Sequence, residues 1–386
     1  MTKIMGKAMN ENTLELYVHI PFCVKKCSYC DFLSGPADPD IQKKYVDALK
    51  TEIDSIMEEA GQPVSSIYIG GGTPSVLPPE WITSVMDKIK ERFQILENAE
   101  ISMEANPGTL DEKKLRCYRQ SGINRLSLGL QSPREKELKI LGRIHSSREF
   151  LESYLMAREA GFSNINVDLM MALPGQSVED WEENLRWVAR LCPQHISAYS
   201  LIIEEGTPFE KMELDLPDED SEYRMYENTA GILEKYGYHQ YEISNFALEG
   251  RECRHNVGYW ERKNYLGLGL GAASLVNNRR FSNTSDMGEY LKYSKVPDEI
   301  RRDVQILTRQ EQMEEFMFLG LRMTRGVSAA EFQRHFGISI EKEYGTVLHK
   351  YIKMGLLCYE GDRIFLSGSG IHVSNVIMAE FLHEND

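Results

Sequence analysis

Several features are scarce in this 386-residue sequence, and each scarcity argues against a class of protein. No apolar stretch approaches the length needed to cross a bilayer, and the N-terminal MTKIMGKAMNENTLEL has no apolar core typical of a secretion signal. Positive charge is also scarce, since 44 Lys and Arg residues against 59 Asp and Glu residues leave a formal charge of −15. A non-specific nucleic-acid coat needs a basic face. We therefore expect a cytoplasmic protein that has no membrane span and does not bind nucleic acid.

The chain has seven cysteines, and an odd number in a long chain fits poorly with a disulfide framework. Four are scattered and are predicted to be ordinary thiols: Cys117, Cys192, Cys253 and Cys358. The other three lie in one short segment, CVKKCSYC, at residues 23–30. We therefore expect a functional site at this segment.

Cys23, Cys27 and Cys30 follow the first predicted strand, and thiolates are the usual ligands of iron–sulfur clusters. An electron-transfer ferredoxin needs a fourth protein ligand, and none lies nearby. A structural zinc site is the alternative, but it prefers four ligands, commonly in paired C-x₂-C units. The spacing favours a 4Fe–4S cluster on these three residues, with its fourth iron open to an external ligand.

The order of the predicted elements indicates an α/β fold. Short apolar, β-branched runs at 14–22, 65–72, 99–105, 124–130, 164–173 and 195–203 alternate with amphipathic helical stretches such as 45–60, 80–93 and 178–191. Six β–α units in succession predict a parallel sheet, either curled into a partial barrel or doubly wound.

Polar residues near the ends of these strands favour the barrel. Because side chains alternate along a strand, three strands present polar sets on one face: Ser102, Glu104 and Asn106; Ser127, Gly129 and Gln131; Asn166 and Asp168. In parallel α/β folds the carboxyl ends of the strands carry the ligand site. We therefore expect a ligand at this end of the barrel.

Four parts are predicted along the chain: an N-terminal tail (1–13), the partial (β/α)6 barrel (14–205), a barrel extension (206–300) and a smaller C-terminal α+β domain (301–386). In the extension, residues 238–247 are expected to form one strand. In the last part, helices precede a hairpin that turns near Gly361 and Asp362, as in winged-helix modules. Mixed charges there favour a packing domain over DNA binding.

The motifs YVHIPFCVKKCSYCDF, GGGTPS, EANPGTL, LSLGLQS and VDLMMALPGQ, in this order, resemble the radical S-adenosylmethionine (SAM) superfamily, in the branch that contains HemN and HemW. The resemblance begins at Leu14 and covers nearly the whole chain, so the C-terminal part resembles a HemN-type domain. It implies that SAM binds the open iron and yields a 5′-deoxyadenosyl radical on reduction by a donor such as flavodoxin or ferredoxin.

The resemblance also implies which residues contact SAM. Tyr17 and Tyr29 flank the cluster segment, while Gly71, Gly72 and Thr73 match the loop used for the methionine end. Further matching positions are Glu104, Gln131, Arg143, Asp168, Ser200 and Ala273. From the residues alone, the glycines could form a plain turn and Arg143 a surface ion pair.

Two departures separate the chain from HemN-type coproporphyrinogen dehydrogenases: Phe32 stands where they have a further cysteine, and the N-terminal extension is short. The segment HNVGYW instead fits the HNxxYW pattern of HemW-type heme chaperones. His255 is then the predicted axial heme ligand, with Tyr259 and Trp260 against the porphyrin. A histidine that only makes local hydrogen bonds is the alternative.

We therefore expect a heme chaperone that uses a 4Fe–4S cluster and SAM and passes heme to an acceptor protein, with a homodimer as one expected state. The alternatives are an oxygen-independent coproporphyrinogen III dehydrogenase of porphyrin biosynthesis and a radical enzyme for an unrelated substrate. Cys253 could lie beside the heme, whereas His19 is expected to be structural or near the cluster.

Overall fold

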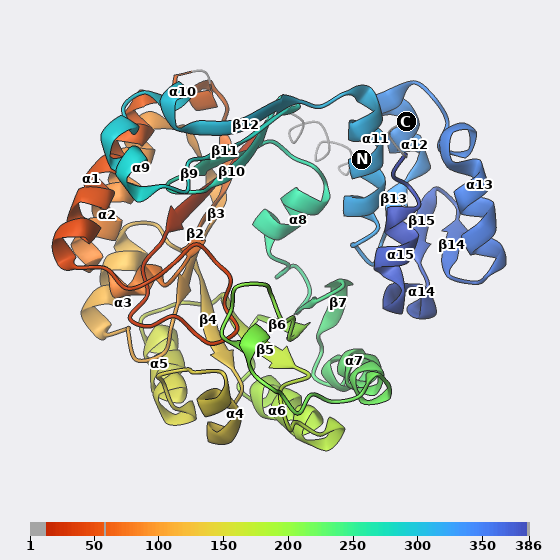
Figure 1. The fold of residues 1–386 in the computed structure, drawn as a ribbon, viewed down its shortest axis with the longest axis horizontal. Coiled ribbons are helices and arrows are strands. Elements are labelled where there is room, and N and C mark those ends of the chain that lie inside the picture. The colour runs from red at the N-terminus through yellow and green to blue at the C-terminus, as the bar shows by residue number, and fades with distance from the viewer. Residues whose placement is uncertain (1–12, 58, 384–386) are drawn as a thin grey trace, which may run out of the picture.

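The structure, a computed structural model, describes residues 13–57 and 59–383 (Figure 1). Apart from Thr13, the predicted tail lies outside the described residues. The first six strands are β1 (Leu14–Ile20), β2 (Val64–Gly71), β3 (Ile95–Ala105), β4 (Arg125–Gln131), β5 (Ile165–Met171) and β6 (His195–Ser200). They pair in this order and in parallel, which confirms the α/β fold with a parallel sheet. None of the described helices is long and apolar enough to cross a membrane.

Helices connect these strands and cover the outer side of the curved sheet (Figure 1). They are α1 (Pro39–Ser55), α2 (Pro79–Arg92), α3 (Glu112–Gln120), α4 (Glu135–Ile140), α5 (Ser147–Glu159) and α6 (Val178–Arg190). Short 3₁₀ turns lie at Glu59–Gly61, Pro74–Val76 and Phe209–Lys211. Serine capping boxes begin α5 and α6, where Ser146 and Ser177 accept hydrogen bonds from backbone N–H groups.

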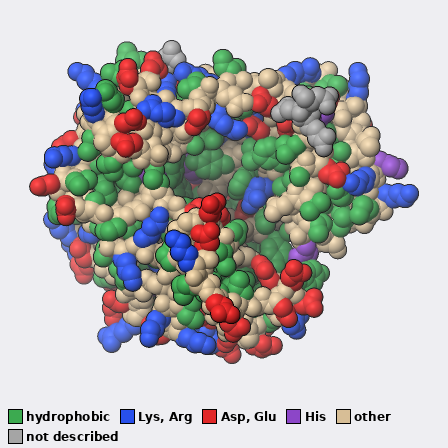
Figure 2. All heavy atoms as spheres, viewed as in Figure 1, with side chains coloured by type: hydrophobic (Ala, Val, Ile, Leu, Met, Phe, Trp, Pro, Cys, Tyr) green, Lys and Arg blue, Asp and Glu red, His purple; other side chains and the backbone are tan. Residues whose placement is uncertain are grey.

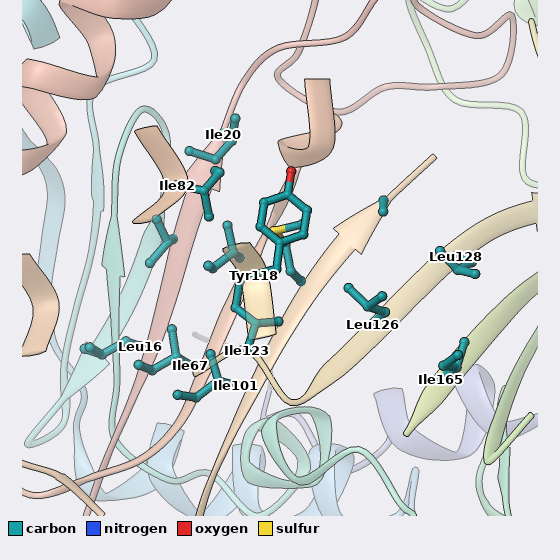
Figure 3. Close-up of a cluster of buried hydrophobic side chains, with 14 of the residues drawn as sticks. Leu16, Ile20, Ile67, Ile82, Ile101, Tyr118, Ile123, Leu126, Leu128 and Ile165 are labelled. Atoms are coloured by element: carbon teal, nitrogen blue, oxygen red, sulfur yellow. The ribbon is translucent and has the colours of Figure 1, made fainter. Parts of the chain in front are cut away.

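Alternation along the strands decides what lies inside the curve. Apolar residues such as Leu16, Ile67, Ile101, Leu126 and Ile165 pack together with the helices in the main core (Figure 3). The residues between them are largely polar and point to the concave side. Examples are Glu15, Ser66, Tyr68, Glu104, Arg125 and Asp168. The sequence therefore gives the sheet an apolar convex face and a polar interior.

Further strands extend the sheet at both edges, giving the order β12-β11-β10-β9-β1-β2-β3-β4-β5-β6-β8-β7. The added strands are β7 (His239–Glu242), β8 (Asn245–Ala247), β9 (Tyr265–Leu268), β10 (Ala273–Val276), β11 (Arg279–Asn283) and β12 (Arg301–Ile306). The helices of this region are α7 (Glu219–Glu234), α8 (Arg254–Trp260), α9 (Met287–Tyr293) and α10 (Pro297–Ile300). In Figure 1, α8 lies on the concave side of the sheet.

The prediction of one strand at 238–247 is wrong, because β7 and β8 form a tight antiparallel hairpin. Glu242 stabilises the reversal, since its Oε1 accepts hydrogen bonds from the Ser244 backbone N–H (2.8 Å) and from Asn245 Nδ2 (2.6 Å). A side chain that caps a turn two residues ahead leaves little trace in an apolar pattern.

A second apolar cluster lies at the C-terminal end of the chain, around Met317, Phe332, Leu348 and Ile364. It is formed by α11 (Arg309–Gly320), β13 (Val327–Ser328), α12 (Ala329–Phe336), α13 (Ile340–Lys353), β14 (Leu357–Glu360), β15 (Arg363–Leu366), α14 (Gly368–His372) and α15 (Ser374–Ala379). The predicted hairpin is present, as β14 and β15 pair around residues 361–362. β12 belongs to the large sheet, and the exact division of the chain into parts stays a prediction.

Candidate cluster and nucleotide site

The loop after β1 holds Cys23, Cys27 and Cys30 at the carboxyl ends of the strands. All three thiols are free and partly exposed, and they line one cavity of about 400 Å³. Figure 2 shows that this face of the molecule is hollowed near its middle. Burial raises the pKa of the Cys30 thiol, so a metal or cation is needed to hold its thiolate.

Two neighbours fix the positions of these thiols. Arg143 Nη1 lies 3.6 Å from Cys27 Sγ, and Thr73 Oγ1 lies 3.5 Å from Cys23 Sγ. The backbone N–H of Thr73 also donates to the carbonyl of Phe22 at 2.7 Å. A guanidinium and a hydroxyl at these positions can each donate a hydrogen bond to a sulfur ligand of a cluster.

No group of three or more His, Cys, Asp or Glu side chains in the described residues is close enough to hold a single metal ion. A 4Fe–4S cluster bonds each thiolate to a different iron, so it does not need three sulfurs around one ion. No fourth cysteine lines the cavity among the described residues. The donor set therefore fits a cluster with one iron left for an external ligand.

Glycine is required where the loop after β2 approaches the thiols. A Cβ built on Gly72 would stand 2.7 Å from the Phe22 carbonyl oxygen and 3.0 Å from Cys23 Sγ. Gly71 has a φ of +110°, and a Cβ there would overlap the His19 ring. His19 itself bonds the Tyr17 hydroxyl (3.0 Å) and the Leu33 carbonyl (3.0 Å), so it joins β1 to the end of the cysteine loop.

Two half-buried carboxyl groups face the same cavity. Glu104 accepts hydrogen bonds from the Tyr68 hydroxyl (3.0 Å) and the Gly71 N–H (3.1 Å), and burial raises its pKa to about 7, with Asp168 adding to the effect. Asp168 accepts from Asn166 Nδ2 at 2.7 Å, and burial raises its pKa too. Hydroxyl or ammonium groups of a ligand could donate to both carboxylates.

The remaining wall comes from β4 and the segments that follow β3 and β6. Arg143 Nη2 donates to Asn106 Oδ1 (2.8 Å) and to the Gly129 carbonyl (2.6 Å), and its Nε has no partner in the structure. Gln131, in the left-handed region at φ 69°, accepts from the Tyr199 hydroxyl at 2.7 Å. The unpartnered, buried Nε–H of Arg143 is consistent with a ligand that completes the site.

The cavity thus brings together most of the residues that the sequence predicts for SAM: Tyr29, Gly71, Gly72, Thr73, Glu104, Gln131, Arg143, Asp168 and Ser200. Tyr17 and Ala273 do not line it, although the Tyr17 ring stacks on Tyr68 with centroids 6.4 Å apart. Sequence reasoning missed Tyr68 and Tyr199, which also line the cavity. Asn106 lines it too, as expected from the strand face that it shares with Glu104.

The predicted heme residues lie elsewhere, on α8 inside the barrel. His255 is 1% exposed, and its ring nitrogens bond Ser66 Oγ (2.8 Å) and the Tyr259 hydroxyl (2.9 Å). Burial lowers the pKa of His255 to about 3. Trp260 packs beneath Arg322, whose guanidinium lies 4.4 Å from the ring. The structure does not bring His255 to the cavity, and both ring nitrogens are engaged in this conformation.

The chain is similar to known proteins over nearly its whole length. The Radical SAM superfamily model matches residues 17–188, and the HemN C-terminal domain model matches residues 307–373. The chain is 37% identical to the heme chaperone HemW of Bacillus subtilis, over 95% of this chain and 99% of that protein. The chain belongs to the HemW family of radical SAM proteins. HemW of Escherichia coli is 35% identical over 96% of this chain and 98% of its own length.

Among solved structures, the coproporphyrinogen III oxidase HemN of Escherichia coli, a radical SAM enzyme, superposes with a TM-score of 0.85 at 25% identity. The match covers 96% of this chain and 90% of HemN. It confirms the predicted radical SAM fold with a smaller C-terminal domain. Family membership implies a 4Fe–4S cluster and SAM as the cofactors.

Proposed function

We propose that the protein is a heme chaperone, which binds heme and passes it to an acceptor protein. The observation that carries the proposal is the near full-length similarity to HemW proteins, which are heme chaperones by name. The site supports the proposal, because Phe32 stands where HemN-type dehydrogenases have a further cysteine. Its side chain is 60% exposed and lines the cavity.

Cys23, Cys27 and Cys30 are proposed to hold the cluster, and the other residues of the cavity to hold SAM. When bound, such a cluster supplies one electron to the sulfonium group of SAM. Glu104 and Asp168 would accept hydrogen bonds from the ligand, while Arg143 would stabilise the Cys27 thiolate. The protein would thereby orient the nucleotide before any electron arrives.

His255, Tyr259 and Trp260 remain the proposed heme residues, with a condition that the structure imposes. Ligation by His255 requires that one of its two hydrogen bonds break and that α8 expose the ring. Each lost bond costs about 0.5–1.5 kcal/mol, which an iron–imidazole bond can offset. We therefore propose that heme binds a conformation in which α8 has moved.

Electron donation by a small redox protein such as flavodoxin or ferredoxin and formation of a homodimer also belong to this proposal. The cysteine loop is suited to the first, since Val24, Lys25 and Lys26 are exposed beside the thiols. Two lysines in a chain of −15 net charge form a local positive site for an acidic donor.

Anaerobic reconstitution followed by hemin titration tests the function. We expect a saturable Soret band from one heme per chain, and transfer of that heme to an apo-hemoprotein mixed with the loaded chain. His255→Ala should weaken heme binding at least tenfold. A chain with an intact cluster that gives no saturable Soret band would refute the chaperone proposal.

The second candidate is a coproporphyrinogen III dehydrogenase, which the superposition on HemN favours. It predicts protoporphyrinogen and carbon dioxide from coproporphyrinogen III, SAM and reductant. Absence of product from a cluster-loaded chain would exclude it, whereas turnover would exclude a purely chaperone role.

A further inference from the structure

A second, smaller hollow lies beside Cys27 at the surface of the protein, and we call it the outer hollow. Its volume is about 20 Å³, room for roughly one water molecule, so it does not hold an organic ligand. Its exposed walls come from two segments, the cysteine loop with Lys25 and Cys27 and the turn after α4 at residues 142–145. Of the three cysteines of the loop, Cys27 alone lines both this hollow and the large cavity.

The two segments are fixed against each other. The backbone N–H of Ser28 donates to the Leu141 carbonyl at 3.0 Å. Gly142, at φ +73°, comes so close that a Cβ there would stand 2.7 Å from Ser28 Oγ. Arg143, the next residue, has its Nη1 3.6 Å from Cys27 Sγ. The outer hollow is therefore a preformed part of the surface, and a thiol proposed to hold the cluster lies in its wall.

The side chains around the outer hollow are apolar and positively charged. Val24 and Ile144 are 57% and 56% exposed. Lys25 and Lys26 are exposed as well, and neither forms an ion pair with a described residue, since Lys26 Nζ donates to the Phe32 carbonyl at 2.9 Å. A small apolar centre with unpaired positive charge beside it is suited to a transient complex with an acidic protein.

The carboxylates of this region leave that positive charge in place. Glu135 and Glu149, which act on His145 of the turn, accept hydrogen bonds from backbone N–H groups at the start of α5. Burial lowers the pKa of His145 to about 4, so its ring is neutral at neutral pH. Asp31 lines the large cavity and not the outer hollow. The lysines of the cysteine loop therefore determine the charge that an approaching protein meets.

The outer hollow reaches Cys27 without crossing the proposed SAM site. Thr73, Asn106 and Arg143 line both cavities and form the partition between them. An electron that cleaves SAM has to arrive while SAM fills the large cavity, so the mouth of that cavity is closed to the donor. A ligand thiolate is bonded to iron, and an electron that reaches Cys27 Sγ can pass directly to the cluster.

We propose that Val24, Lys25, Lys26 and Ile144 form the docking face for an acidic one-electron carrier protein. The inference rests on the electron donation that belongs to the proposed function, and it names where the donor binds. A flavin hydroquinone anion of the donor loses one electron and becomes the neutral semiquinone, while the cluster gains that electron. No bond forms or breaks, and no proton moves. The lysines steer the acidic donor, and the two apolar side chains are buried between the proteins.

The first test measures the rate of electron entry. Parent chain and a Lys25→Glu, Lys26→Glu double variant are reconstituted anaerobically, and absorbance follows reduction of the cluster by photoreduced flavodoxin. At about 0.01 M salt the double variant should be reduced at least about tenfold more slowly, which is within the range of electrostatic steering. The difference should fall below about threefold at 1 M salt, where the Debye length is only about 3 Å. The neutral deazaflavin radical, which needs no docking face, should reduce both chains equally fast.

A Lys235→Glu, Lys353→Glu double variant is the matched control. Both lysines are exposed, on α7 and α13, and the variant has the same net charge as the first one. Flavodoxin should reduce the control at the rate of the parent. Equal slowing of the two double variants, or the parental rate in the Lys25→Glu, Lys26→Glu variant, would overturn the proposal. Loss of a dimer in that variant at an unchanged reduction rate would assign the face to a second copy of the chain and overturn it too.

The second test locates the donor. A carbodiimide joins carboxyl groups of oxidised flavodoxin to lysine side chains with loss of water, and mass spectrometry identifies the lysines. Cross-links should form at Lys25 and Lys26 and not at Lys353, and saturating SAM should change their yield by less than about twofold. Loss of these cross-links on addition of SAM would mean that the donor enters through the nucleotide cavity, and would overturn the proposal.

Both tests are independent of heme, so the docking face and the chaperone function can fail separately. A chain that flavodoxin reduces through Lys25 and Lys26 but that binds no heme supports the docking face and refutes the chaperone function. A chain that binds and transfers heme, and whose cluster deazaflavin reduces but flavodoxin does not, overturns the docking face alone.

Discussion

Gly258 of α8 lies directly against the carboxyl group of Glu15, so that a Cβ at position 258 would overlap both oxygens of Glu15. The helix that carries HNVGYW therefore packs so closely against β1 that only glycine fits at position 258. The fit explains why α8 can fill the barrel interior, and it gives a direct way to disturb that helix alone.

Gly258→Ala is expected to destabilise the chain by about 1–3 kcal/mol, because the added methyl group overpacks a closed interior. Urea unfolding of the apo chain measures the change. Gly231→Ala is the control, since Gly231 lies in α7 with nothing within 4 Å of a built Cβ. There alanine should stabilise by about 0.5–1 kcal/mol. Equal stability of Gly258→Ala and the parent would show that α8 does not pack as described.

Glu15 predicts a pH dependence of stability. Burial raises its pKa from 4.5 to about 8, with Glu100 adding to the effect and Lys263 opposing it. The folded chain keeps this proton up to about pH 8, whereas the unfolded chain loses it near pH 4.5. The contribution of Glu15 to stability is therefore present below pH 4.5 and is lost as the pH rises to 8.

Glu15→Gln removes this titration. The unfolding free energy of the variant minus that of the parent should increase by a few kcal/mol, as an order of magnitude, between pH 5 and pH 8. Urea titrations at several pH values give the difference. A difference that stays constant over this range would contradict a protonated Glu15 at neutral pH.

Gly72→Ala is expected to impair cluster retention, because its Cβ would press on the Phe22 carbonyl and on Cys23 Sγ. After anaerobic reconstitution and desalting, the variant should keep less than half of the iron that the parent keeps. Gly35→Ala, in the cysteine loop after β1 and with nothing within 4 Å of a built Cβ, should keep the parent's iron content. Full iron in Gly72→Ala would mean that the loop after β2 does not limit the cluster.

Substitution of Arg143 is expected to weaken retention of the cluster, not its initial assembly. It contacts Cys27, Asn106 and the Gly129 carbonyl at once, which a lysine cannot do, because an ammonium group lacks the planar fork. Arg143→Lys should keep the charge and the initial iron content, but should lose cluster absorbance several times faster in the presence of a chelator. An unchanged rate would restrict Arg143 to a structural role between β4 and the segment after β3.

The sequence predicts the features of the molecule that depend on residues close together in the chain. Six apolar runs in order give the parallel sheet, and three close cysteines after the first run give the cluster loop. Glu104 and Asp168 can be placed at the cavity because their alternation with apolar neighbours is regular. These features depend on neighbours within a few residues of each other.

Other features depend on contacts between distant segments, which no local pattern contains. His255 of α8 is buried because Glu15 of β1 and Ser66 of β2 lie around it. Tyr68 and Tyr199 look like ordinary strand aromatics, and only the curvature of the sheet brings them to the cavity. The β7–β8 turn likewise depends on Glu242 folding back on the next residues.

The iron and labile sulfide content of serine variants shows whether Cys23, Cys27 and Cys30 hold a 4Fe–4S cluster. Chain with serine at 23, 27 and 30 and chain with serine at exposed Cys192 are reconstituted anaerobically beside the parent. We expect four irons and four sulfides per chain in the parent and in Cys192→Ser, and almost none in the triple variant. Undiminished iron and sulfide in the triple variant would contradict it.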